Sequence, residues 1–267
     1  MLDHHSWAPH HVDQERPNAA RIYDYLLGGA CHSAVDRVLA QQLLDAMPQA
    51  RHVARANRAF LRRSVRYMAE RGVRQFIDIG AGAPTAGSVH ETARRFGPGS
   101  RVVYVDQEPI VVASTRLVVD GQVGAEVVHA DFRQPYTVLT APAVRELDFS
   151  RPIGLLLCAV LHYVPDSAGP AALLARYRDA LPPGSQLALS HATAEGVSGG
   201  IHEVARIYAA NAVPLTLRTK SEIGQIIAGF EPVEPGVVYV PHWRPESPED
   251  LVDSPEVAVY GLVADLG

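Results

Sequence analysis

The feature that most constrains the fold is a series of short, nearly continuous apolar segments that alternate with amphipathic ones from Gln75 onward. Segments that are apolar on both faces are typical of strands in a parallel sheet covered by helices on both sides. Right-handed crossovers make such a region a doubly wound, mostly parallel α/β domain. The predicted strands are Gln75–Ile79, Arg101–Val105, Glu126–His129, Ile153–Cys158 and Gln186–Ser190, and the predicted helices between them are Ser88–Phe96, Ile110–Val119 and Pro170–Leu181.

The segment before the first strand is predicted to be helical. Its apolar residues recur at helical spacing, and Gly28-Gly29 ends the first helix. We therefore expect a flexible tail at residues 1–15, an N-terminal helical lid at 16–72 and an α/β domain at 73–267. The predicted helices are Ala19–Leu27, Asp36–Met47 and Arg55–Glu70.

The segment after the fifth strand is expected to complete the sheet. Gly200–Ala212 is predicted to be helical, and Thr219 with Glu222 has the spacing of a capping box at a further helix start. Two last strands, Val237–Val240 and Val257–Val263, are joined by a Pro-rich loop without a helix. They are therefore expected to form an antiparallel hairpin.

Composition argues against several kinds of partner. The net charge of −5 and the pI of about 6.2 do not favour nucleic acid or an anionic membrane surface. No run approaches the roughly 18 apolar residues of a transmembrane helix. The two cysteines, Cys31 and Cys158, are too few for a disulfide framework, and Cys158 is expected to be a reduced, buried thiol of a cytoplasmic protein.

No set of residues at metal-ligand spacing is found, so no metal is expected. The histidines near the N-terminus lack a supporting fold and are expected to lie on a loose tail. They are His4, His5, His10 and His11.

The segment Phe76–Thr85 (FIDIGAGAPT) indicates a ligand site, because a strand runs into a glycine-rich turn before a helix. Acidic residues end the next strands: Asp106 follows RVVYV, and Asp131-Phe132 follows VVHA. Ligands of open α/β sheets bind beyond the carboxyl ends of the strands, so these side chains should converge on one crevice. Asp106 could accept both hydroxyls of a ribose, and Asp131 and Phe132 could hold an adenine amine and ring.

The type of nucleotide follows from two residues. Thr85 stands where a dinucleotide-binding fingerprint needs its third glycine, and Asp78 would repel a pyrophosphate. Asp78 could instead receive the ammonium of a methionine moiety. No G-K-[ST] sequence follows the turn, which excludes a kinase-type phosphate loop. These residues favour a sulfonium nucleoside over a dinucleotide.

At this point the chain resembles a known family, the actinobacterial S-adenosylmethionine-dependent methyltransferases once grouped as a domain of unknown function, DUF574. The likeness covers nearly the whole chain. The segments that carry it are RPNAARIYDYLLGG (Arg16–Gly29), ANRAFLRRSVRYMAERGVRQFIDIGAGAPTAGSVHE (Ala56–Glu91), RVVYVDQEPIVVA (Arg101–Ala113), HADFRQP (His129–Pro135), AVLHYVPD (Ala159–Asp166) and EPGVVYVPHWRP (Glu234–Pro245).

The resemblance implies a class I methyltransferase fold, with a seven-stranded Rossmann-like sheet and S-adenosylmethionine as the cofactor. It implies that Asp78, Gly80 and Gly82 line the methionine end and that Asp106 binds the ribose. Asp131 and Phe132 would frame adenine, and Cys158 with Ala159 would back the cofactor.

The chain departs from the family pattern at two places. Ala30–Ser33 replaces a charged, Asn-containing run and could contact a different acceptor. Gln107 and Glu108 replace the usual acidic-and-polar pair beside the ribose, a change that the site is expected to tolerate.

Candidates for catalysis are His162 and His191, which follow the fourth and fifth strands, and Glu195 in the next loop. An oxygen or nitrogen acceptor would need such a base, although a histidine beside the cofactor could also serve packing alone.

Other polar and aromatic residues have less certain roles. Tyr23 is expected at the cofactor and Tyr25 near it, with core packing as the alternative. Arg16, Asn18 and Arg21 could bind an acidic acceptor or could stabilise the first helix. The loop His242–Arg244 is expected to be structural.

Three functions are compatible with these residues. The preferred one is a methyltransferase that acts on an unidentified small-molecule acceptor. The others are a non-catalytic S-adenosylmethionine-binding regulator and, less favoured, an NAD-dependent oxidoreductase.

Overall fold

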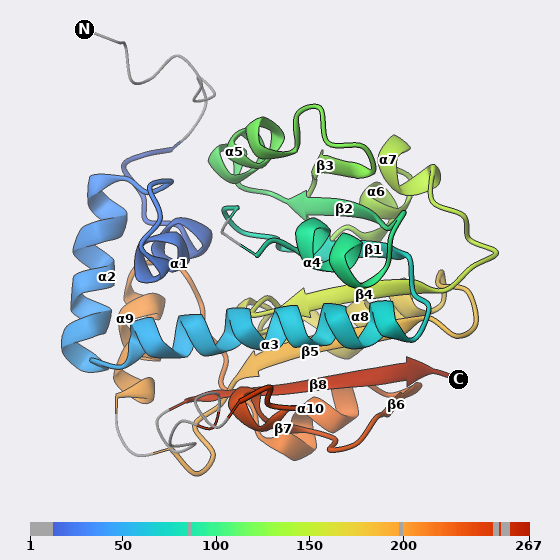
Figure 1. Cartoon of the computed structure of the whole chain (residues 1–267). Helices are drawn as coiled ribbons and strands as arrows, with labels where there is room; N and C mark the ends of the chain where they lie inside the picture. The colour runs from blue at the N-terminus through green and yellow to red at the C-terminus, as the bar shows by residue number, and fades with distance from the viewer. Residues whose placement is uncertain (1–12, 85–86, 198–199, 248–250, 252–256) are drawn as a thin grey trace, which may run out of the picture.

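The computed structural model describes residues 13–84, 87–197, 200–247, 251 and 257–267 (Figure 1). Thr85 and most of the predicted tail, with its four histidines, lie outside these residues. Within them, the chain forms one central sheet with helices on both sides and a group of helices at its N-terminus.

The sheet has the order β3-β2-β1-β4-β5-β8-β6, with β7 also paired to β8. The first five strands are parallel, and β8 runs antiparallel to β5. Because the strand order reverses beside β1, the carboxyl ends of β1, β2 and β4 border a crevice. These strands are β1 (Gln75–Ile79), β2 (Arg101–Asp106), β3 (Ala125–His129), β4 (Ile153–Cys158), β5 (Gln186–Ala192) and β8 (Val259–Leu266).

Successive residues of the central strands enter two different hydrophobic cores. In β4, Leu156 packs in one core, whereas Leu155 and Leu157 pack in the other. The same alternation occurs in β2 and β5, so the strands are apolar on both faces. This confirms the expectation of a mostly parallel sheet covered on both sides.

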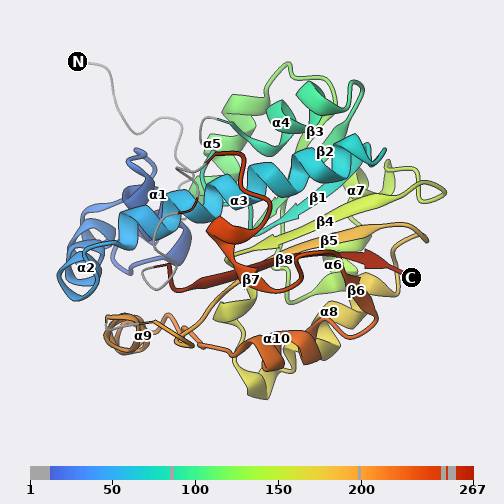
Figure 2. The ribbon, with the colours of Figure 1, turned by 60° about the horizontal axis from the view of Figure 1, so that its bottom comes forward.

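Helices cover both faces of the sheet (Figure 2). α3 (Ala50–Glu70), α4 (Val89–Phe96) and the end of α5 (Pro109–Val119) enclose one core. On the other face lie α6 (Pro135–Leu139), α7 (Pro142–Arg145), α8 (Pro170–Arg178) and α10 (Lys220–Ile226). The short helices α6 and α7 were not predicted.

The edge of the sheet beyond β8 differs from the simple hairpin that was expected. β7 (Val238–Tyr239) does pair antiparallel with β8, as predicted. A further strand that was not predicted, β6 (Phe230–Pro232), pairs with the end of β8. Two short strands thus share one edge position, and the described sheet has eight strands in a seven-position order.

The N-terminal helices stand at the carboxyl ends of the strands. They are α1 (Ala19–Leu27) and α2 (Ala34–Ala46), and α9 (Ile201–Ala210) packs against α2. Asn18 caps α1 by accepting from the backbone N–H groups of Ala20 and Arg21. After α1 the chain turns tightly over Asp24, where a Cβ on Gly29 would lie 1.9 Å from a carboxylate oxygen. A side chain at Gly29 would therefore clash with Asp24, and only glycine fits there.

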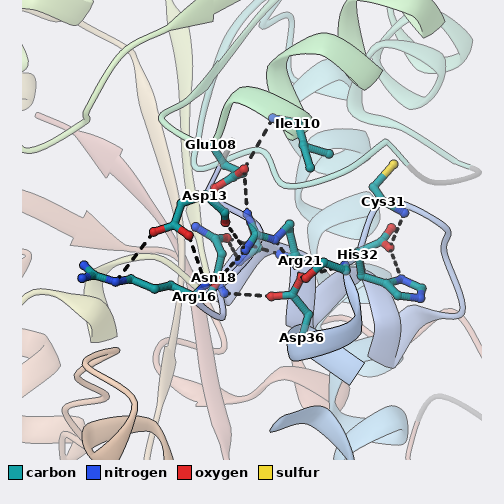
Figure 3. Close-up of polar contacts among 12 residues, drawn as sticks. Asp13, Arg16, Asn18, Arg21, Cys31, His32, Asp36, Glu108 and Ile110 are labelled. Atoms are coloured by element: carbon teal, nitrogen blue, oxygen red, sulfur yellow. Dashed lines mark hydrogen bonds and ion pairs between the residues drawn. The ribbon is translucent and has the colours of Figure 1, made fainter. Parts of the chain in front are cut away.

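A buried guanidinium connects these helices to the sheet (Figure 3). Arg21 on α1 donates to Asp36 on α2 at 2.7 Å and to Glu108, after β2, at 3.0 Å. It also donates to the carbonyl oxygens of Asp13 and Arg16. All three charged side chains are almost fully buried. Of the two roles considered for Arg21, the structure shows ion pairing within the fold.

We predict that Arg21→Met lowers the free energy of unfolding by about 3–5 kcal/mol, because it leaves two buried carboxylates without their cation. Denaturant unfolding would measure the change. Arg66→Met is the matched control, since the exposed ion pairs of Arg66 with Glu70 and Glu246 should contribute less than about 1 kcal/mol. Equal losses in the two variants would contradict this role for Arg21.

Candidate functional site

A cavity of about 350 Å³ opens at the carboxyl ends of β1, β2 and β4. The glycine turn forms its floor, and residues of α1, α3 and the segment after α9 close over it. Of the residues predicted to bind a cofactor, nine line it: Tyr23, Asp78, Gly80, Gly82, Asp106, Gln107, Phe132, Cys158 and Ala159.

The glycine turn is held against β2 by a carboxylate. Asp106 accepts a hydrogen bond from Gly82 N–H at 3.0 Å on one oxygen and from Glu108 N–H at 2.8 Å on the other. Gly80 has a φ of +64°, and a Cβ there would lie 2.5 Å from a methyl carbon of Val160. Only glycine fits this position without displacement. Each oxygen of Asp106 keeps a further lone pair for a ligand hydroxyl.

Asp78 and Arg58 place opposite charges at one end of the cavity. Asp78 is buried, and this burial raises the pKa of its carboxyl to about 7, against the opposing effect of Arg58. Arg58, on α3, donates from one nitrogen to Ala83 O at 3.0 Å. Its Nε is buried and has no hydrogen-bond partner among the described residues. A buried donor without a partner suggests that a ligand acceptor completes the site.

The opposite end of the cavity is formed after β3. Phe132 and Arg133 line it, whereas Asp131 does not. The carboxylate of Asp131 instead accepts from Arg133, at 3.0 Å from Nε and 2.8 Å from a terminal nitrogen. These hydrogen bonds, against the effect of partial burial, lower the pKa of Asp131. Phe132 lines the cavity as expected, but Arg133 lines it in place of the expected carboxylate of Asp131.

The wall beside β4 is fixed by a chain of hydrogen bonds. Tyr23 donates to Ala54 O and accepts from Asn57, and Ser190 donates to Asn57 Oδ1 at 2.5 Å. Ser190 Oγ in turn accepts from Ala159 N–H, which holds Ala159 at a φ of +60°. Such backbone strain in a residue other than glycine is concentrated at functional sites. Cys158 beside it is a free thiol, as expected, but the residue is partly buried where a buried one was expected.

A second cavity of about 90 Å³ lies next to the first. Both are lined by Tyr23, Asn57, Ala159 and Tyr163. His162 lines only the second. Burial lowers the pKa of its ring well below the usual value, and its Nδ1 accepts from Ala192 N–H at 3.2 Å. His162 is therefore neutral at pH 7, with its proton on Nε2.

The other two candidate bases line neither cavity. β5 continues to Ala192, so His191 lies inside the strand and its side chain is fully buried. Its ring contacts Ala192 O through Nδ1 at 2.8 Å and Arg218 through Nε2 at 2.7 Å. Burial lowers its pKa to about 4. Glu195 accepts from Lys220 N–H at 2.8 Å.

Several other residues singled out in the sequence lie away from both cavities. In the segment Ala30–Ser33, Cys31 N–H and His32 Nδ1 both contact Asp24. The Tyr25 ring packs on His32 and Arg51. Trp243 is fully buried between the rings of Phe60 and Tyr67, so its side chain packs in the core.

Sequence reasoning did not identify Arg58 and Asn57. Both lie on α3, which carries six arginines, and no local spacing distinguishes Arg58 from the others. Their place at the cavity depends on how α3 packs against β4, β5 and β8. To predict Arg58 and Asn57 from the sequence, one would need to know which side of α3 faces the sheet.

Within the described residues, no group of three or more His, Cys, Asp or Glu side chains could hold a metal ion. None of the helices found there is both long and apolar enough to cross a membrane.

We predict that Asp78 makes the ligand-free protein less stable as the pH rises. The pKa of its carboxyl in the folded protein, about 7, exceeds the ordinary aspartate value of 3.8. The stability contributed by the protonated form is therefore present below pH 4 and is lost as the pH rises through 7. Replacing Asp78 by Asn should raise the free energy of unfolding relative to wild type by about 3 kcal/mol more at pH 8 than at pH 5.

Urea unfolding at the two pH values would measure this difference. Asp45→Asn, on the exposed side of α2, is the control for loss of a carboxylate. A difference between Asp78→Asn and wild type that does not change with pH would contradict the prediction.

A family model described as S-adenosyl methyltransferase matches residues 5–267. None of the curated proteins matches the chain. A crystal structure of a putative methyltransferase from Thermobifida fusca is 37% identical, with a TM-score of 0.91, and covers 98% of this chain and 99% of its own. A DUF574 family protein from Streptomyces avermitilis is 38% identical, with a TM-score of 0.92, and covers 96% and 99%.

The fold is also similar to that of a more distant protein. The N-methyltransferase NodS from Bradyrhizobium japonicum, solved with S-adenosylhomocysteine, is 13% identical with a TM-score of 0.50. The alignment covers 86% of this chain and 97% of that one, and it shows the fold alone.

Proposed function

We propose, since this chain belongs to the family of S-adenosyl methyltransferases, that its first cavity binds S-adenosylmethionine and that the methyl group passes to a small-molecule acceptor. The observation that carries the donor assignment is the pair Asp78 and Arg58 at one end of the cavity. A carboxyl group and a buried guanidinium donor complement an ammonium and a carboxylate, the two charged groups of a methionine moiety.

The remaining residues fit the nucleoside part. Asp106 has lone pairs left for the two ribose hydroxyls, and the backbone at Gly80 can approach a ligand closely. The Phe132 ring offers a face for adenine. We assign no adenine contact to the Asp131 carboxylate, because Arg133 occupies both of its oxygens; Asp131 would act by holding Arg133 at the cavity wall.

When bound, S-adenosylmethionine would supply an electrophilic methyl group on its sulfonium: an acceptor lone pair would attack the methyl carbon in line with the C–S bond, and that bond would break as S-adenosylhomocysteine leaves. The protein would contribute chiefly by holding the reactants in position, an effect that can supply on the order of 7–11 kcal/mol. α1 and the segment after α9 would act as a lid that excludes water from the donor. Tyr23 and Asn57 lie where the two cavities meet and would orient both reactants.

His162 is the histidine that we assign to the acceptor. With Nδ1 engaged by Ala192 N–H, its neutral ring presents an N–H donor. It would therefore orient the acceptor and would not remove a proton from it. His191 would serve the packing of β5, since both of its ring nitrogens have partners within the protein.

We predict that Arg58→Gln weakens binding of S-adenosylhomocysteine by about 10- to 100-fold, because a charge-assisted hydrogen bond is lost. Binding of 5′-methylthioadenosine, which lacks the amino-acid carboxylate, should stay unchanged. Calorimetric titration would measure both affinities.

Arg55→Gln, on the exposed side of the same helix, is the control and should bind both compounds as wild type does. If Arg58→Gln weakened both compounds equally, or neither, the methionine end of the donor would not lie at Arg58.

A further inference from the structure

The second cavity has a different chemical character from the first. Its described lining residues are mainly apolar side chains of α2, α3 and α9, and they include no Asp, Glu, Lys or Arg. The first cavity, by contrast, is lined by five charged side chains: Arg58, Asp78, Asp106, Glu108 and Arg133. A cavity with charged lining residues therefore lies beside one whose described lining residues are uncharged.

The position of the second cavity relative to the proposed donor follows from the strand order. Going from β3 through β2 to β1, the first cavity meets Phe132, then Asp106, then Asp78. The next strands in that direction are β4 and β5. The second cavity lies there, lined by Ala159 and His162 after β4 and by Ala192 of β5. It thus adjoins the methionine half of the donor, which carries the reactive methyl group.

The polar groups in the second cavity are few and uncharged. The His162 ring is neutral, and its Nδ1 accepts a hydrogen bond from Ala192 N–H. Tyr163 and Tyr208 are linked by a side-chain hydrogen bond, and burial raises the pKa of both hydroxyls. The cavity can therefore satisfy one or two polar atoms of a ligand, but it offers no counter-ion.

We propose that the second cavity holds the reacting part of the methyl acceptor and that this part is an uncharged, mostly apolar group about the size of one aromatic ring. The proposal rests on the donor assignment above. An ion placed here would lose its hydration without a compensating charge, which is far costlier than burying a neutral polar group that is hydrogen-bonded. A cavity of about 150 Å³ holds benzene in another protein, so a cavity of about 90 Å³ that shares four lining residues with the first cavity has room for one ring at most.

Three matched probes test this assignment: benzyl alcohol, benzoate and benzylammonium. Each would be added to the full chain at pH 7 with saturating S-adenosylhomocysteine, and binding would be followed by saturation-transfer NMR of the probe. Benzyl alcohol should bind at least 10-fold more tightly than either ion. Equal binding of an ion, or binding of none of the probes, would overturn the proposal.

Variants locate the bound probe. Val204→Phe fills the second cavity from α9 and should abolish binding of benzyl alcohol, whereas Ala209→Phe on the exposed side of the same helix should not. If Val204→Phe does not fold, Leu215→Trp fills the cavity from a loop residue that is only partly buried. Binding that persists in a folded filling variant would overturn the assignment.

Calorimetry with S-adenosylhomocysteine separates the two proposals. Wild type and both filling variants should bind it with the same affinity, since Val204 and Leu215 do not line the first cavity. Failure of wild type to bind would remove the donor site and this proposal together. Donor binding without benzyl alcohol binding would remove the acceptor assignment alone.

Discussion

The guanidinium of Arg21 joins two parts of the chain that enclose the first cavity. It lies between Asp36 on α2 and Glu108, which follows β2 and itself lines the cavity. A buried ion pair of this kind adds little net stability over apolar packing, but any arrangement that leaves one partner alone is strongly penalised. The interaction therefore selects one position of α1 over the sheet. With α1 in that position, Asn18 and Tyr23 reach the cavity.

The segment that pairs with Arg21 also contributes to the difference in charge between the two cavities. Glu108 lies two residues after Asp106 and donates its backbone N–H to the Asp106 carboxylate, which also accepts from Gly82 N–H. The glycine turn and the N-terminal helices are therefore fixed through one short segment. Charged side chains line the first cavity, whereas the second cavity has none among its described lining residues. The hydrogen-bonded chain from Tyr23 to Ala159 lies between the two cavities. Burial raises the pKa of Asp78 to about 7, so this carboxyl suits a cationic ligand better than an empty site.

Much of this architecture could be predicted from the sequence because the central strands are local apolar runs with clear ends. The ends of β1, β2 and β4 carry the residues that line the first cavity, and the rule for open α/β sheets brings them together. The prediction was weaker where tertiary contacts decide. β6 is three residues long and ends in proline, so it is too short to show the alternation of apolar and polar residues that indicates a strand.

Side-chain partners were the other obstacle to prediction. Asp131 follows its strand as expected, but Arg133 two residues later takes its carboxylate. His191 was placed after β5, yet the strand runs two residues further than the apolar run and turns this ring into the interior. Arg58 is one of six arginines on a helix, and only the packing of α3 on the sheet selects it.

The most direct test of the account is calorimetric titration of the purified chain with S-adenosylmethionine, S-adenosylhomocysteine and NAD, with Asp106→Ala as the variant. We predict micromolar binding of the two sulfur nucleosides, no binding of NAD, and loss of binding in the variant. Binding of NAD without either sulfur nucleoside would contradict it, and so would sulfur-nucleoside binding that Asp106→Ala leaves unchanged.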